Sequence, residues 1–120
     1  MTNAEYGNGH GQVWCLDPRE RELTLIFQST DPSVLDLPDN MTISPRGTIV
    51  LCEDGADGNF VRLLTEDGGL VDFARNNTDR PNDEFAGATI SPDGRTLFVN
   101  IQSDFGRTIA IWRENGGLRF

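Results

Sequence analysis

The feature that most constrains the fold is an internal repeat. Residues 42–47 (Thr-Ile-Ser-Pro-Arg-Gly) recur almost unchanged at 89–94 (Thr-Ile-Ser-Pro-Asp-Gly), 47 positions further along the chain. An apolar, strand-like segment follows each copy, at 48–52 and at 96–100. Proline pre-sets φ for a turn, and glycine takes a backbone state that other residues resist. Each of the two copies is therefore predicted to form a β-hairpin.

Other short apolar segments surround these hairpins. Two further pairs are separated by polar or glycine-containing turns, which is typical of hairpins. The predicted strands are 13–16 with 23–27, 60–64 with 70–73, and a last one at 108–112. No window shows a sustained period of 3.6 residues with helix caps, so almost no helix is predicted beyond one turn over 31–36.

Strands grouped in fours at a period of about 40–50 residues are typical of propeller blades. We therefore predict an all-β fold: a partial β-propeller of about two blades, in one domain spanning 1–120. The complete blade is expected at 42–75, the outer two strands of the preceding blade at 12–29, and three strands of the next at 88–113. The alternative is a small β-sandwich of about nine strands, which would bury its own core. Isolated blades leave apolar faces open, so self-association or pairing with missing blades is expected.

Composition excludes several functions. The net charge is −9, from 19 acids against 10 arginines, and no lysine is present, so neither nucleic acid nor an anionic membrane is expected as a partner. Without lysine there is no Walker A loop, and the single histidine, His10, argues against a Ser-His-Asp triad. Cys15 and Cys52 lie in apolar segments, where we expect both to be small buried hydrophobic residues.

Several acidic residues lie where predicted strands begin or end. In a blade, the residue before the innermost strand and the residue after the second strand lie at the same end of the central channel. This rule gathers Asp39, Asn40, Glu53, Asp54 and Glu84. Carboxylate and amide oxygens of this kind suit Ca²⁺ or, with other ligands, iron or manganese. The alternative is that these residues only shape turns, as Asp and Asn before a strand often do.

At the same segments the sequence resembles the PhoX-type alkaline phosphatases. The resemblance runs in order along nearly the whole chain and includes unusual motifs. Its segments are 11–14 with 17–18, 38–40, 44–47, 51–55, 73–76, 84–88 (Glu-Phe-Ala-Gly-Ala) and 91–102. Calcium-dependent lactonases and phosphotriesterases with six blades also carry Glu, Asn and Asp at the channel mouth, but segments 51–55 and 84–88 fit the PhoX family better.

The resemblance implies a six-bladed propeller that hydrolyses phosphate monoesters with Ca²⁺ and Fe³⁺ at the channel mouth. It implies export of the folded enzyme to the periplasm or cell surface. Arginine forks match phosphate oxygens, which adds phosphate-binding candidates near the metal ligands. Carried over residue by residue, the implied metal ligands are Glu84, then Asn40, Asp39 and Glu53, and the implied phosphate-binding residues are Arg80 and Arg75.

The departures from the family narrow these expectations. Family members are several times longer, so four blades are expected to be missing here with their ligands, including a cysteine that would bind iron. No twin-arginine signal is seen, which leaves the compartment of the fragment cytoplasmic or unknown. Alone, the chain is expected to bind metal weakly and to turn over no substrate. The alternative function is a non-catalytic, propeller-derived interaction module or an inactive remnant.

Overall fold

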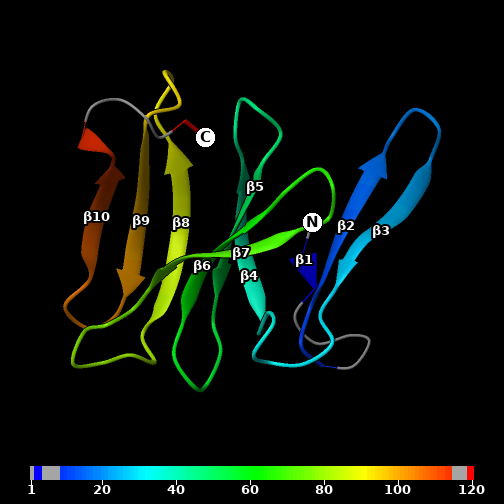
Figure 1. Cartoon of the computed structure of the whole chain (residues 1–120). Helices are drawn as coiled ribbons and strands as arrows, with labels where there is room; N and C mark the ends of the chain where they lie inside the picture. The colour runs from blue at the N-terminus through cyan, green and yellow to red at the C-terminus, as the bar shows by residue number, and fades with distance from the viewer. Residues whose placement is uncertain (1, 4–8, 115–118) are drawn as a thin grey trace.

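The chain folds into three antiparallel β-sheets that stand side by side (Figure 1). A computed structural model describes residues 2–3, 9–114 and 119–120. The first sheet contains β1 (Thr2–Asn3), β2 (Gln12–Asp17) and β3 (Glu22–Gln28) in that order. The second contains β4 (Pro38–Ile43), β5 (Ile49–Glu53), β6 (Phe60–Leu64) and β7 (Leu70–Arg75), again in chain order. The third has the order β10 (Arg107–Trp112), β9 (Thr96–Gln102) and β8 (Glu84–Ile90).

This architecture confirms the predicted all-β, partial propeller. No α-helix occurs in the described part of the chain, and residues 32–34 form only a turn before β4. Within the described ranges, no helix is long and apolar enough to cross a membrane. The four-stranded sheet begins at Pro38, four residues before the repeat, because β4 already pairs with the end of β5 there.

The repeated motif forms the same hairpin turn twice. Ser44 and Ser91 each receive a backbone hydrogen bond from the turn glycine, Gly47 at 3.0 Å and Gly94 at 2.8 Å. Each serine hydroxyl also accepts from the backbone N–H groups on the far side of the turn. Both glycines have positive φ, 86° and 70°, a state that a side chain would strain. The turn chemistry therefore sets the register of β4 with β5 and of β8 with β9.

The middle sheet is covered on both faces. Successive residues of a strand point to opposite faces, and β5 is almost wholly buried because both of its faces meet a neighbouring sheet. Val50 and Cys52 face the third sheet, in a cluster with Phe85, Leu97 and Val99. Leu51 and Leu64 point the other way and pack with Val13 and Leu35. This stacking of sheets resembles successive blades of a propeller.

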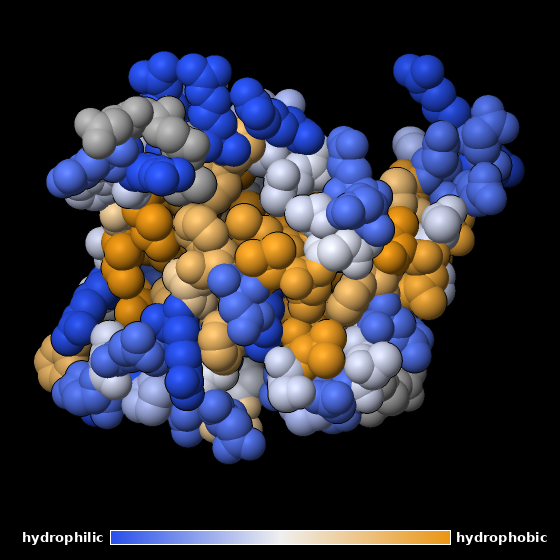
Figure 2. All heavy atoms as spheres, viewed as in Figure 1, coloured by the Kyte–Doolittle hydropathy of each residue, from blue (hydrophilic) through white to orange (hydrophobic). Residues whose placement is uncertain are grey.

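The two outer sheets leave apolar side chains in solvent. Leu16 pairs across strands with Leu23, and both are at least half exposed. On the other side of the molecule, Trp112 at the end of β10 is 63% exposed. Apolar side chains also cover much of the visible face, including the β2–β3 hairpin (Figure 2). Cys52 is buried as predicted, whereas Cys15 is exposed because it lies on β2 beyond the part that packs on the middle sheet.

These exposed side chains generate a prediction about association. Contiguous apolar surface tends to be covered by another protein surface, so we expect the purified chain to self-associate as its concentration rises. Sedimentation velocity should show a rising mean mass, and the double variant Leu23→Gln, Trp112→Gln should shift it towards the monomer. A matched change at two exposed polar positions, Glu20→Gln with Thr108→Ser, should leave it unchanged. A sharp wild-type monomer at all concentrations would contradict the expectation.

Candidate metal centre

A β-bulge at the start of β4 gives Asp39 its direction. Pro38 pairs with Glu53 and Asn40 pairs with Cys52, so two steps along β4 match one step along β5. Asp39 is the extra residue. A bulge leaves its extra residue out of the ladder and redirects its side chain, and bulges are common beside functional sites. Asp39 is exposed at this end of the sheet.

Three carboxylates from two adjacent sheets converge at this point. Asp39 comes from β4, Asp54 follows the last residue of β5, and Glu84 is the first residue of β8. One carboxylate oxygen of each lies within 4.8 Å of the other two. Asp39 and Asp54 are exposed, and Glu84 is half-buried. We call these three residues the acidic cluster.

The three carboxylates of the acidic cluster repel one another, and this repulsion affects their pKa values. Burial raises the pKa of Glu84, and the nearby charges of Asp54 and Asp39 raise it further. Burial likewise raises the pKa of Asp54, followed by the charge of Asp39, while a hydrogen bond with Glu84 works in the opposite direction. Opposite charge nearby would relieve this repulsion. The donor set is entirely carboxylate oxygen, which fits a hard cation such as Ca²⁺.

Asn40 borders the acidic cluster from β4. Its Nδ2 donates to Oδ1 of Asp39 at 2.7 Å. Its Oδ1 accepts from the backbone N–H of Gly87, on the neighbouring sheet, at 3.4 Å. Both ends of this amide therefore have protein partners, one of them a member of the acidic cluster.

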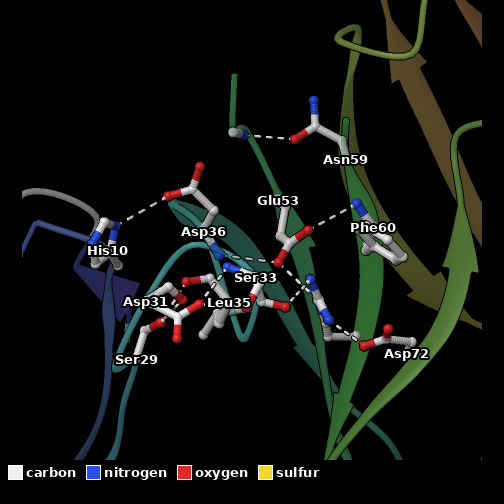
Figure 3. A network of polar contacts seen from close by, with 12 residues as sticks. His10, Ser29, Asp31, Ser33, Leu35, Asp36, Glu53, Asn59, Phe60 and Asp72 are labelled. Carbon is white, nitrogen blue, oxygen red and sulfur yellow. Dashed lines mark hydrogen bonds and ion pairs between the residues drawn. The ribbon is translucent and has the colours of Figure 1, made fainter. Parts of the chain in front are cut away.

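The structure does not bring Glu53 into the acidic cluster. Its side chain is 1% exposed and faces the interior. Oε1 accepts from the backbone N–H of Asp36 at 3.0 Å and from Nε of Arg62 at 2.8 Å, and Oε2 accepts from the backbone N–H of Phe60 at 2.9 Å (Figure 3). Because neighbouring strand residues face opposite ways, Asp54 rather than Glu53 reaches the acidic cluster.

The two arginines predicted to bind phosphate lie apart from each other. The exposed guanidinium of Arg75 sits over the ring of Phe60, with 5.5 Å from Cζ to the ring centroid, and lines a cavity of about 360 Å³. Arg80 forms a long ion pair of 3.9 Å with Asp104 and borders a separate cavity of about 190 Å³. Their part in phosphate binding stays a prediction.

Sequence reasoning missed the buried ion pair that holds Glu53. Arg62 is buried, and besides Glu53 it pairs with the exposed Asp72 on β7. The available signal was an arginine between Val61 and Leu63, inside an otherwise apolar strand. A buried charge needs a partner, and the nearest strand of the hairpin ends in Glu53.

The fold and the acidic cluster together define an all-β, propeller-like chain with a candidate metal centre between two sheets. The profile of the family "Alkaline phosphatase PhoX" matches residues 1–104, so the chain belongs to the PhoX alkaline phosphatase family. This confirms the resemblance seen in the motifs. The chain is also 29% identical to regucalcin of Xenopus laevis, in an alignment 131 positions long that covers 98% of this chain and 42% of regucalcin. No solved structure matches the chain.

The Glu53 network yields a stability prediction. Glu53→Ala would leave the buried guanidinium of Arg62 without its buried partner, and breaking a buried pair in this way costs about 3–5 kcal/mol. Urea unfolding should therefore show a large loss, compared with a change within about 0.5 kcal/mol for Glu20→Ala in the exposed β2–β3 turn. Equal midpoints for the two variants would show that the network contributes little.

The raised pKa values predict how stability depends on pH. The pKa values of Asp54 and Glu84 in the folded chain are raised above their ordinary values of 3.8 and 4.5. Both carboxyl groups therefore bind a proton more tightly when the chain is folded. Their contribution to stability is therefore lost as the pH rises through the folded pKa values. Glu84→Gln should stabilise the cation-free chain relative to wild type at pH 7, and less so at pH 4. Urea unfolding in a chelator at both pH values measures this difference, and a destabilised variant at pH 7 would contradict it.

Proposed function

We propose that this chain supplies part of the metal site of a PhoX-type phosphatase that hydrolyses phosphate monoesters. The observation that carries the proposal is the convergence of Asp39, Asp54 and Glu84 from two adjacent sheets onto one point. Carboxylates from separate elements that meet at the end of a propeller-like stack form a hard-oxygen site. Family membership supplies the reaction class.

The ions proposed are the Ca²⁺ and Fe³⁺ implied by the family. Ca²⁺ takes 6–8 oxygen ligands, so the three carboxylates of this chain would hold it together with water or with oxygens from further blades. A bound cation polarises phosphoryl oxygens and lowers the pKa of bound water. In this scheme Asp39, Asp54 and Glu84 hold the cation, and Asn40 orients Asp39 through its hydrogen bond.

Activity is proposed for a larger assembly. The chain spans 42% of the length of regucalcin, the curated relative that it matches, and its outer sheets expose apolar side chains that further blades would cover. Arg80 and Arg75 are the proposed phosphate contacts in that assembly. We further propose the periplasm or cell surface as its compartment, in line with the family, and expect no nucleic-acid or membrane partner for so acidic a chain.

Two assays test this proposal. Tb³⁺ luminescence titration of the chain, with Ca²⁺ as competitor, should show saturable binding that Glu84→Gln weakens by at least about tenfold, which corresponds to about 1.4 kcal/mol. Glu20→Gln, the same change at an exposed glutamate, should bind like wild type. Hydrolysis of p-nitrophenyl phosphate with Ca²⁺ and Fe³⁺ should then appear only when the N-terminal blades of a family member are added, and should depend on Glu84.

The outcomes separate the two candidate functions. If cations bind but the complemented protein has no hydrolysis that depends on Glu84, the chain is a non-catalytic module with a metal site. If Tb³⁺ binds wild type and Glu84→Gln equally well, the proposed metal site is wrong. The open apolar faces favour an interaction module as the second candidate.

A further inference from the structure

A second bulge lies on β8, directly beside the acidic cluster. Ala86 pairs with Asn100 and Thr89 pairs with Phe98, so Gly87 and Ala88 together oppose a single residue of β9. Gly87 has a φ of 61°, and a Cβ there would lie 2.8 Å from Nδ2 of Asn100. Glycine is therefore required at this turn of the strand. Such a bulge takes backbone N–H groups out of the ladder, and these groups need other acceptors.

Side chains of the neighbouring sheet accept from both residues of this bulge. The N–H of Gly87 donates to Oδ1 of Asn40, and the backbone of Ala88 forms a hydrogen bond with the sulfur of Cys52. Asn40 and Cys52 are themselves cross-strand partners on β4 and β5. Asn40 and Cys52 of the middle sheet thus both contact the bulge of the third sheet.

The residues of these inter-sheet contacts lie close in sequence to the members of the acidic cluster. Asn40 follows Asp39 and also donates to its Oδ1 at 2.7 Å. Cys52 precedes Asp54 by two residues, and the β8 bulge begins three residues after Glu84. The residues whose contacts join the two sheets therefore lie within one to four residues of the carboxylates that the two sheets contribute.

We infer that Asn40 and Cys52 are positioning residues that set the separation between Asp39 and Asp54 on one sheet and Glu84 on the next. We call the pair, with its contacts to Gly87 and Ala88, the inter-sheet clamp. The clamp itself needs no metal, but its role at an ion rests on the proposed function. Cys52 is fully buried in the apolar cluster, so it acts through packing and its hydrogen bond and does not touch the cation.

This assignment gives Asn40 a role different from that of a ligand. The family resemblance makes its amide oxygen a metal ligand, whereas here that oxygen accepts from Gly87 on the other sheet. A ligand role predicts that only changes at Asn40 weaken cation binding. A clamp predicts that changes at the buried Cys52 weaken it too, in step with the loss of the Ala88 hydrogen bond.

The test compares four variants of the full chain by two readouts. Asn40→Ala removes both amide contacts, Cys52→Ala removes the sulfur acceptor, Cys52→Ser restores an acceptor of similar size, and Asn77→Ala changes an exposed asparagine as a control. Amide hydrogen exchange without metal reports the clamp, and Tb³⁺ luminescence reports the ion site. Urea unfolding confirms that each variant is folded under the assay conditions.

The expected pattern is specific. Exchange at Gly87 should rise about 3- to 10-fold in Asn40→Ala, and exchange at Ala88 should rise similarly in Cys52→Ala, as expected for the loss of one net hydrogen bond. Both variants should weaken Tb³⁺ binding by a similar factor, Cys52→Ser should recover part of it, and Asn77→Ala should change neither readout.

The outcomes distinguish failure of the clamp from failure of the metal site. If the amide of Ala88 stays protected from hydrogen exchange in Cys52→Ala, the proposed clamp is wrong. If both amides respond but Cys52→Ala binds Tb³⁺ as tightly as wild type, the positioning role is wrong. If wild type binds no Tb³⁺ while both amides respond as expected, the clamp stands and the proposed function fails.

Discussion

The carboxylate of Glu53 is the constraint on which this end of the middle sheet depends. It accepts from the segment before β4 through Asp36, from the start of β6 through Phe60, and from the guanidinium of Arg62. A buried ion pair repays its desolvation only when its geometry is good and its remaining positions are hydrogen-bonded. Here three donors meet one carboxylate, so the end of β5 is held in place from three directions. Asp54, the next residue, therefore leaves the sheet in a defined direction.

The acidic cluster follows from two irregularities placed on this rigid frame. A bulge in β4 sets Asp39 apart from the ladder, and a bulge in β8 follows Glu84 and turns towards the middle sheet. Bringing three carboxylates together costs electrostatic free energy, and the raised pKa values of Asp54 and Glu84 reflect that cost. Apolar packing between the two sheets offsets it, since the largest core cluster lies directly between them. Opposite charge placed among the three carboxylates would relieve their repulsion.

Much of the fold followed from the sequence because its signals are local. The Ser-Pro-x-Gly turns set two hairpins, and strand topology alone gathered Asp39, Asp54 and Glu84 at one end. Glu53 was misplaced in that group because the rule ignores which way a strand residue faces. The position of Arg62 inside an apolar strand could have corrected it. Bulges and their acceptors, such as Cys52, depend on pairing between strands and are invisible in a single segment.

The location of the acidic cluster ties it to the packing of the sheets. Its members come from the two sheets that share the larger core cluster, and the middle sheet is the only one in the described chain with both faces covered. Packed interiors transmit displacement because they have little free volume. A blade that covered an outer face would therefore act on the separation of these carboxylates through the intervening sheet. Under the proposed function, a blade added at an outer face is therefore expected to change the affinity of the acidic cluster for a cation.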